Sequence, residues 1–311
     1  METEGTERLS LASLSQWNES EIIQRLPQWF GEFADGDSAL RTKIVVGVTA
    51  AIEASSEEQM NGVIHALLAS RKNFQYYPAH PAARSVLRAF VGGLSLDSEL
   101  LGGRHLAEAH AEGPVLVLCN HLAYCDTQLT DLLLAQNGFE HLANNLIAVA
   151  GPKVYDTMFR RMASLGMGTI KTAQSSQLVH NETGMSPRQV AEVAIQTVRT
   201  AQECMLQGGI VVLYAEGSRS RSGRLAPFLK AVRRYVRMDG LRIVPMALGG
   251  TQRMMPIGST VMRQASVRLQ IGAPILVADH GPMVAIQEAW SRIASMALPD
   301  NQPEPATPSI A

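Results

Sequence analysis

The stretch Val115-Leu116-Val117-Leu118-Cys119-Asn120-His121-Leu122-Ala123-Tyr124-Cys125-Asp126 decides the fold of this chain. Its first five residues are apolar, a pattern that predicts a short and fully buried strand. Asn120 and His121 follow where the strand ends, and Asp126 comes after four further residues. An imidazole and a carboxylate at the carboxyl end of a buried strand can together remove a proton from a hydroxyl. The stretch therefore predicts a core strand and a candidate catalytic pair.

The spacing of His121 and Asp126 sets a condition on the local structure. On a regular helix, residues five apart point about 140° away from each other and cannot meet. The two side chains can meet only if His121 lies in the turn before a helix and Asp126 lies in its first turn. A helical pattern starts near Thr127, which suits that arrangement. The carboxylate would then hold the proton on one ring nitrogen and leave the other nitrogen free to accept one.

A second buried strand carries the next candidate site. The apolar run Ile210–Tyr214 is followed, after Ala215, by Glu216-Gly217-Ser218-Arg219. Gly217 permits a tight turn, and Arg219 offers a planar fork of donors that matches a phosphate. In α/β sheets, ligands bind at the carboxyl ends of the strands. We therefore expect this turn to lie at the same edge as His121 and to bind an anion.

The pattern of the remaining chain predicts an α/β fold, with a mixed but mostly parallel sheet flanked by helices. Short aliphatic runs alternate with helical segments after residue 80. The predicted strands are Val115–Cys119, Leu146–Ala150, Thr169–Ile170, Ile210–Tyr214, Ile243–Leu248 and Val267–Ile271. The predicted helices are Thr127–Gln136, Pro152–Leu165, Pro187–Gln207, Pro227–Met238 and Met283–Met296.

Before this region, the periodicity predicts helices over Ser13–Phe33, Asp37–Ala54 and Ser56–Arg71, followed by a connector over Asn73–Ala83. We therefore expect a small all-helical N-terminal domain (1–80) ahead of the α/β domain (81–298). The Pro-rich end (299–311) is expected to be a disordered tail.

Composition narrows the class of protein. The chain has 311 residues, of which 46% are hydrophobic, so it can bury a large core. Its three cysteines lack metal-ligand spacing, which favours a reducing compartment. The N-terminus is acidic where a secretory signal would be basic, and no apolar run approaches the roughly 20 residues that span a bilayer. We expect a cytoplasmic protein, with peripheral contact to the inner face of a membrane left open.

The segment from Arg219 to Arg242 is strongly basic, with eight Arg or Lys residues and a single acid, Asp239. If Pro227–Met238 is a helix, Lys230, Arg233, Arg234 and Arg237 share one face. Such a face could attract anionic lipid headgroups, the phosphates of CoA or an acidic carrier protein. A solvated helix face would look the same in the sequence.

Taken together, the two strand ends resemble the glycerolipid acyltransferases, which include glycerol-3-phosphate and lysophosphatidate acyltransferases. Asn120-His121, with Asp126 after four residues, is similar to the first block of that family. Glu216-Gly217-Ser218-Arg219 is similar to the third block, whose usual form is Phe-Pro-Glu-Gly-Thr-Arg-Ser. Here Ala215 replaces the proline and Ser218 replaces the threonine while keeping its hydroxyl.

Two further stretches are similar to the remaining blocks, so the resemblance covers residues 113–275. Leu165–Lys171 resembles the second block, which commonly carries an arginine for the phosphate of the acceptor; here Lys171 is the nearest cation. Ile243–Leu248 resembles the fourth block, and Val244 and Pro245 are expected to line the acyl pocket.

The resemblance implies a metal-free and cofactor-free O-acyltransferase. His121 would act as general base, oriented by Asp126, on a hydroxyl that attacks the thioester of an acyl-CoA or acyl-carrier protein. The acceptor would be a phosphate-bearing lipid precursor, namely glycerol-3-phosphate or a lysophospholipid. The implied substrate-binding residues are Glu216, Gly217, Ser218, Arg219 and Lys171, with Arg219 on the phosphate.

Other functions stay open at this point. The same fold could acylate a different acceptor, such as an amine or a secondary-metabolite hydroxyl, and the lysine at 171 motivates that alternative. A non-catalytic protein that binds acyl chains or lipids is a second one. Nothing in the sequence points to nucleic acid as a partner.

Overall fold

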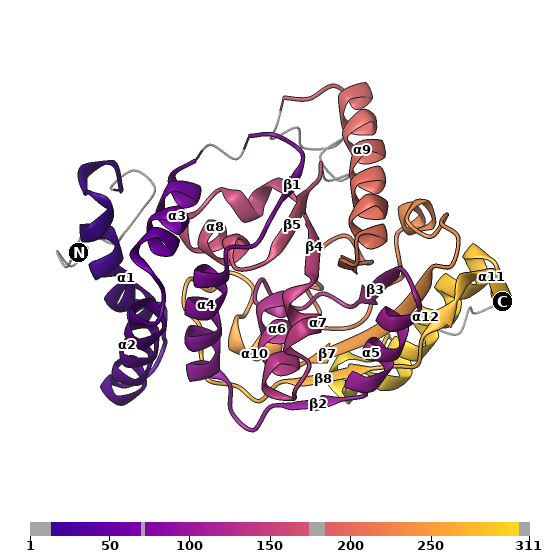
Figure 1. The fold of residues 1–311 in the computed structure, drawn as a ribbon. Helices are drawn as coiled ribbons and strands as arrows, with labels where there is room; N and C mark the ends of the chain where they lie inside the picture. The colour runs from indigo at the N-terminus through magenta and orange to yellow at the C-terminus, as the bar shows by residue number, and fades with distance from the viewer. Residues whose placement is uncertain (1–13, 70–71, 174–183, 305–311) are drawn as a thin grey trace.

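The computed structural model describes residues 14–69, 72–173 and 184–304, and one twisted sheet runs through its centre (Figure 1). Eight strands form a continuous path in the order β1-β5-β4-β6-β3-β7-β8-β2, and β9 also pairs with β7. Five neighbouring strands, from β5 to β7, run parallel, whereas β1, β8 and β9 each make an antiparallel pair. The predicted mixed, mostly parallel α/β sheet is confirmed.

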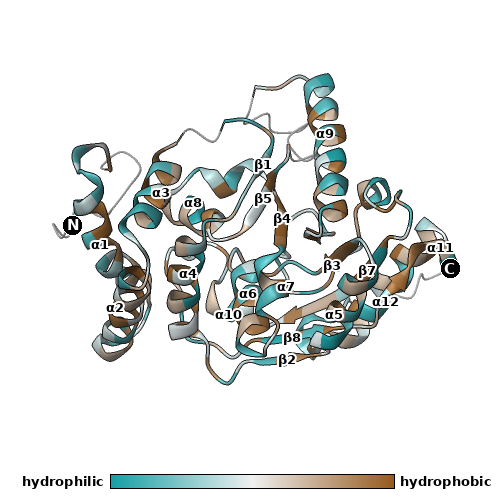
Figure 2. Ribbon diagram, viewed as in Figure 1, coloured by the Kyte–Doolittle hydropathy of each residue, from teal (hydrophilic) through white to brown (hydrophobic). Residues whose placement is uncertain are grey.

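The six predicted strands lie close to their apolar runs, whereas the short strands β1, β2 and β9 were not predicted. Their bounds, in chain order, are β1 Tyr76–Tyr77, β2 Glu99–Leu101, β3 Val115–Cys119, β4 Leu146–Ala150, β5 Gly168–Lys171, β6 Ile210–Tyr214, β7 Arg242–Gly249, β8 Arg268–Ile271 and β9 Ile275–Leu276. β3 is the centre of the sheet, and Val117 pairs with Val212 of β6 on one side and Val244 of β7 on the other. Figure 2 shows β3 and β4 as strongly hydrophobic strands.

Each face of the sheet packs against its own layer. Along β3, Val115 and Val117 belong to one cluster of buried residues, and Leu116 and Leu118 belong to the other. This alternation follows from the two-residue period of a strand. The first cluster includes residues of the helices α1 Glu19–Glu32, α2 Ser38–Glu53, α3 Glu57–Leu68, α4 Pro81–Leu94, α5 Gly103–Glu112, α6 Asp126–Gln136, α7 Glu140–Asn144, α8 Met158–Leu165 and α10 Thr251–Met254.

Within the described residues, fewer elements pack on the second face. Its cluster draws on the helices α9 Pro187–Leu206, α11 Val277–His280 and α12 Pro282–Met296 and on the 3-10 turn η4 Lys230–Arg234. The other 3-10 turns in the described parts of the chain are η1 Leu14–Gln16, η2 Pro152–Tyr155 and η5 Pro299–Asn301. Within the described ranges, no helix is both long enough and apolar enough to cross a membrane.

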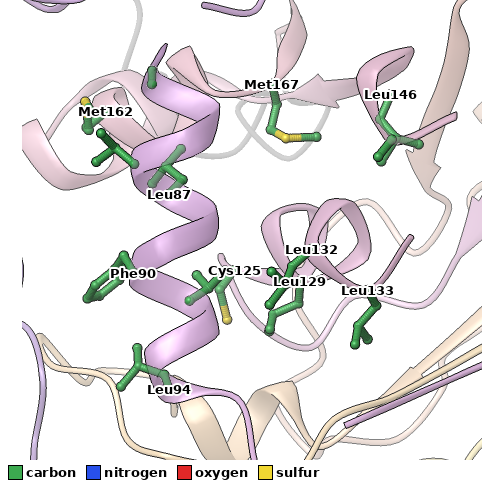
Figure 3. Close-up of a cluster of buried hydrophobic side chains, with 14 of the residues drawn as sticks. Leu87, Phe90, Leu94, Cys125, Leu129, Leu132, Leu133, Leu146, Met162 and Met167 are labelled. Carbon is green, nitrogen blue, oxygen red and sulfur yellow. The ribbon is translucent and has the colours of Figure 1, made fainter. Parts of the chain in front are cut away.

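The N-terminal helices lie beside α4, at one side of the sheet (Figure 1). Side chains of Asn18, Asp37 and Ser56 cap α1, α2 and α3, so each helix begins where its sequence signal is. Leu87 and Phe90 of α4 lie in the buried cluster that Cys125 and Leu129 share (Figure 3). The N-terminal helices thus share a hydrophobic core with the α/β part, and the boundary at residue 80 stays a prediction.

Several expected elements differ from the structure. The predicted helix Pro227–Met238 is wrong, because that stretch holds only the short turn η4. The start of this stretch is tied to the end of β6, because the N–H of Ala226 donates to the Glu216 side chain and that of Leu229 to the carbonyl of Ala215. The predicted helix Pro152–Leu165 is split into η2 and α8. The connector is shorter than expected, since α4 begins at Pro81.

The end of the chain also corrects an expectation. Disorder was predicted from residue 299 onward, yet residues 299–301 form η5 and Asn301 is fully buried. The Asn301 carbonyl accepts from the N–H of Leu225 at 3.0 Å, and its side-chain amide donates to the carbonyl of Gly223 at 2.8 Å. Residues 305–311 of the predicted tail lie outside the described residues.

Candidate active site

The structure brings His121 and Asp126 into contact in the way the spacing requires. His121 lies in the turn after β3, and Asp126 is the first residue of α6. Their side chains meet through Nδ1 of the imidazole and Oδ2 of the carboxylate, 2.8 Å apart. The geometric condition derived from the sequence is therefore confirmed, while the catalytic role of the pair stays a prediction.

The buried Asp126 carboxylate accepts several hydrogen bonds. It is 1% exposed and accepts from the backbone N–H of Leu122 at 2.7 Å and of Ala123 at 3.1 Å. Because an ionised carboxylate can only accept, Nδ1 of His121 carries the proton in their contact. Nε2 then has a free lone pair. It has no hydrogen-bond partner among the described residues, and the His121 side chain is 17% exposed.

Tyr214, the last residue of β6, fixes the plane of the imidazole. Its ring stacks on that of His121 with centroids 4.1 Å apart and planes 23° from parallel. Its hydroxyl lies 2.7 Å from Oγ1 of Thr127, and burial raises the pKa of this phenol well above its ordinary value. Sequence reasoning missed this contact, although Tyr214 pairs in register with Cys119, only two residues before His121.

Glu216 joins the two strand ends through one buried carboxylate. Oε1 accepts from the N–H of His121 and Oε2 accepts from the N–H of Ala226, each at 2.8 Å. Burial raises the pKa of this carboxyl, and the two backbone donors oppose that effect. Ser220 adds a second tie, since its N–H donates to the carbonyl of His121 at 2.7 Å. Glu216 thus positions His121, and its expected contact with a substrate stays a prediction.

Two arginines lie against the ring of Tyr124, three residues after His121. The guanidinium carbon of Arg219 is 3.7 Å from the ring centroid and that of Arg160 is 4.3 Å from it. Arg160 also donates to the carbonyl of Lys153 at 3.2 Å. Neither guanidinium forms an ion pair with a carboxylate in the described part of the chain. Two uncompensated cations beside one ring form a natural anion site.

The turn that carries Arg219 matches its sequence signal. Gly217 has φ +76°, in the left-handed region, and an added Cβ would lie 2.2 Å from the Leu229 side chain. Only glycine fits there without strain. Gly217 and Ser218 are both exposed, so their side of the turn faces solvent. The expected roles of both residues in substrate binding stay predictions.

Arg160 was missed by sequence reasoning, and its place at the start of α8 gave no signal.

Lys171 does not lie with this pair of arginines. It ends β5, and β4 and β6 separate that strand from β3, which is about 14 Å at ordinary strand spacing. Its Nζ lies 5.2 Å from the ring centroid of Phe74 and 5.0 Å from that of Tyr155. Lys171 is 8% exposed, and burial lowers the pKa of its amine. The structure therefore does not bring Lys171 to the His121 site, and its substrate role has no support from the geometry.

The residues expected at the acyl pocket are part of the core. Val244 and Pro245 are buried in β7, beside Val117 and Leu118 of β3. Their proximity to the strand that leads to His121 agrees with the expectation, and a lining role stays a prediction.

Cys125 is 4% exposed, and burial raises the pKa of its thiol well above the ordinary value. A thiol held protonated is a poor nucleophile, as expected for a packing residue.

The fully buried side-chain amide of Asn120 binds the backbone of β7 at the point where β3 ends. The Asn120 side chain donates to the carbonyl of Leu248 at 2.9 Å and accepts from the N–H of the same residue at 2.8 Å. It thereby replaces one step of the ladder between β3 and β7 at the point where the chain leaves the sheet.

Comparison with known proteins relates part of this chain to a family. A model of the acyltransferase family matches residues 103–249, a segment that contains both strand ends and all of the candidate residues just described. This segment belongs to the acyltransferase family.

Two individual proteins that are similar to part of this chain are 1-acyl-sn-glycerol-3-phosphate acyltransferases of plants. The chloroplastic 1-acyl-sn-glycerol-3-phosphate acyltransferase LPAT1 of Arabidopsis thaliana is 34% identical over 103 residues, which are 32% of this chain and 28% of the relative. The 1-acyl-sn-glycerol-3-phosphate acyltransferase of Cocos nucifera is 30% identical over 87 residues, 28% of each chain. The chain thus matches little more than a quarter of the length of these relatives.

A solved structure is similar over a larger span. The 1-acyl-sn-glycerophosphate acyltransferase of Thermotoga maritima shares 13% sequence identity with this chain, and the alignment covers 88% of this chain and 94% of that one. Its TM-score is 0.49.

Proposed function

We propose that this protein is an O-acyltransferase that moves a fatty acyl group from a thioester to the hydroxyl of a phosphate-bearing glycerolipid precursor. The thioester would be an acyl-CoA or an acyl-carrier protein. The acceptor would be a lysophospholipid such as lysophosphatidate, or glycerol-3-phosphate. The observation that carries the proposal is the free Nε2 of His121, whose ring is held by Asp126 and whose turn also carries Tyr124, the ring that two uncompensated arginines contact.

The chemistry needs one proton carrier and no covalent intermediate on the protein. Nε2 of His121 takes the proton of the acceptor hydroxyl as its oxygen attacks the thioester carbonyl carbon. The tetrahedral intermediate then collapses, the carbon–sulfur bond breaks, and the ester is released. The departing thiolate takes the proton back from the imidazolium, so His121 ends as it began. General-base assistance of this kind contributes about 10²–10⁴-fold to rate.

Asp126 and Tyr214 would support the imidazole in different ways. The carboxylate stabilises the imidazolium that forms when Nε2 is protonated and keeps the proton on Nδ1. The stacked phenol ring limits rotation of the imidazole and covers one of its faces. Restricting the ring to one orientation lowers the entropic cost of reaching the reactive geometry.

The arginine pair supports a phosphate on the acceptor. Arg219 and Arg160 both contact the Tyr124 ring, which orders two long side chains before any ligand arrives. A phosphate between them could form charge-assisted hydrogen bonds with both guanidinium groups. An acceptor without phosphate would gain nothing from this arrangement, which favours glycerolipid precursors over neutral alcohols and amines.

The proposal is tested with the purified protein and a panel of acceptors. Thiol release and product mass are followed with one acyl-CoA and, separately, one acyl-carrier protein. The acceptors are lysophosphatidate, glycerol-3-phosphate, a monoacylglycerol of the same chain length and a simple amine. We expect transfer to a phosphate-bearing acceptor at a kcat/KM at least about 10²-fold above that of the monoacylglycerol, as loss of charge-assisted hydrogen bonds would dictate. Equal use of the phosphate-free acceptor would contradict the assignment of the arginine pair.

A further inference from the structure

A groove of about 350 Å³ lies between the segment that follows the Gly217 turn and the first turns of α12. Phe228 and Leu229 line it on one side, and Met283, Ile286 and Trp290 line it on the other. The indole N–H of Trp290 donates to the carbonyl of Ala226 at 3.0 Å, which ties the two walls together. The groove is therefore part of the folded structure and does not need a ligand to form.

The apolar wall of the groove is unusually open to solvent. Met283 is 62% exposed, Val284 beside it is 57% exposed, and Leu229 is 42% exposed. Large apolar side chains that stay together in solvent mark a surface where something binds. The shape is concave, which suits a narrow chain better than a flat partner.

The rim of this groove is cationic. Lys230 and Arg233 line it directly, and Arg234 and Arg237 follow close by in the chain. All four side chains are exposed, and none forms an ion pair with a carboxylate of the described ranges. Among the residues that the structure describes, none of those that line the groove is acidic. Its ligand therefore combines an apolar or neutral chain with at least one anionic group.

The groove is connected to the candidate active site through two short links. The Leu229 side chain lines the groove and also packs against the Gly217 turn, where it fills the position that a Cβ of residue 217 would need. The N–H of Ala226, just before the groove segment, binds the Glu216 carboxylate that also holds the N–H of His121. A chain lying in the groove would therefore have one end beside the turn that carries Arg219.

We propose that this groove binds the 4′-phosphopantetheine arm of the acyl donor, with its phosphate on Lys230 and Arg233 and its thioester end directed toward His121. The arm is a narrow chain with a branched apolar portion and neutral amides, and it ends in a phosphate. Each part thus has a counterpart in the groove. This inference rests on the proposed acyl-transfer function. Acyl-CoA and acyl-carrier protein share this arm, so either donor would use the same groove.

Charge reversal at the groove tests the assignment. The variant is Lys230→Glu/Arg233→Glu, and its matched control is Lys43→Glu/Arg104→Glu on exposed positions of α2 and α5, which do not line the groove. KM and kcat are measured in detergent solution with acyl-CoA, with acyl-carrier protein and with the acceptor. We expect KM for both donors to rise about 10- to 100-fold, as loss of charge-assisted contacts to a phosphate predicts. KM for the acceptor should not change, and the control should behave like the unmodified protein.

A binding measurement separates this inference from the proposed function. 4′-Phosphopantetheine and pantetheine are titrated into the protein and its two variants by calorimetry. We expect the reversal variant to lose affinity for 4′-phosphopantetheine and to keep the weaker binding of pantetheine. Active protein with an unchanged donor KM in the variant would overturn the groove assignment and leave the function standing. Absence of turnover with every donor and acceptor would overturn the function itself.

Two other outcomes would also overturn the groove assignment. A donor KM that rises with acyl-CoA alone would place the cations on the adenosine phosphates in place of the arm. Loss of binding to vesicles containing anionic phospholipid, with donor KM unchanged in detergent, would make the surface a membrane-docking face.

Discussion

The turn from β3 into α6 and the segment from β6 to η4 each follow a central strand, and they use their polar groups in opposite ways. In the first, Asp126 is buried and fully hydrogen-bonded, and the free Nε2 of His121 is the exception. In the second, Arg219, Lys230 and Arg233 are left without carboxylate partners in the described structure. A rigid turn suits proton transfer, and a turn of unpaired cations suits recruitment of anions.

This contrast predicts that changes in the first region lower kcat and changes in the second raise KM. Removing the base should have the largest effect. His121→Ala is expected to lower kcat by about 10³-fold or more. The melting temperature should stay near that of the unmodified protein, because Asp126 keeps the backbone N–H groups of Leu122 and Ala123 as donors. Steady-state kinetics and thermal unfolding measure the two quantities. His65→Ala, on an exposed histidine of α3, is the control, and full activity of His121→Ala would end the assignment.

Asp126→Asn should come next, with a loss in kcat of about 10²-fold. An amide keeps the shape of the carboxylate, but it cannot stabilise an imidazolium and can present a donor toward Nδ1. The N–H groups of Leu122 and Ala123 also lose a charged acceptor, so some stability should be lost as well. Kinetics together with urea unfolding separate the two losses. Asp279→Asn on exposed α11 is the matched control, and a variant with normal kcat would show that the carboxylate is only structural.

In the second region, Arg219→Ala should raise the acceptor KM by about 10- to 100-fold with a smaller change in kcat. Arg160→Ala should act in the same direction, and the double variant should fall short of the sum because both guanidinium groups share one phosphate. Arg221→Ala changes an exposed arginine two residues away and is the control. An increase in donor KM with acceptor KM unchanged would reverse the assignment.

The smallest effect is expected at Tyr214, which links the two strand ends. Tyr214→Phe keeps the stacked ring and removes the hydroxyl that meets Thr127, so kcat should fall by no more than about tenfold. Tyr214→Leu removes the stacking as well and should lose more. If the two variants were equally active, the ring would have no part in orienting His121.

The sequence predicted best those features that depend on local runs of residues. β3, β4 and β6 have the predicted bounds because each is a continuous apolar run with a polar residue or glycine next to at least one of its ends. The His121–Asp126 contact was predictable because both residues come from one turn. The helix over Pro227–Met238 was predicted from its periodicity, but Val232, Tyr235 and Val236 are buried by a different path of the backbone.

Features that depend on contacts across the fold could not be read from the sequence. Tyr214 reaches His121 because β3 and β6 are neighbours in a particular register, and no local pattern states that register. Arg160 meets Arg219 at the Tyr124 ring although the two residues come from α8 and the β6 turn. Lys171 was selected by its place in a motif, and its strand turned out to lie three positions from β3.

The buried Asn301 has a practical consequence for how this chain is cut and tagged. Its two contacts, with the N–H of Leu225 and the carbonyl of Gly223, attach the C-terminal end to the loop that leads from Arg219 to the groove. A truncation after residue 298 would keep every strand of the sheet and remove this attachment. We expect such a truncated chain to fold, to become sensitive to proteolysis between residues 219 and 229, and to bind its substrates weakly. An affinity tag appended beyond residue 304 would leave the attachment intact.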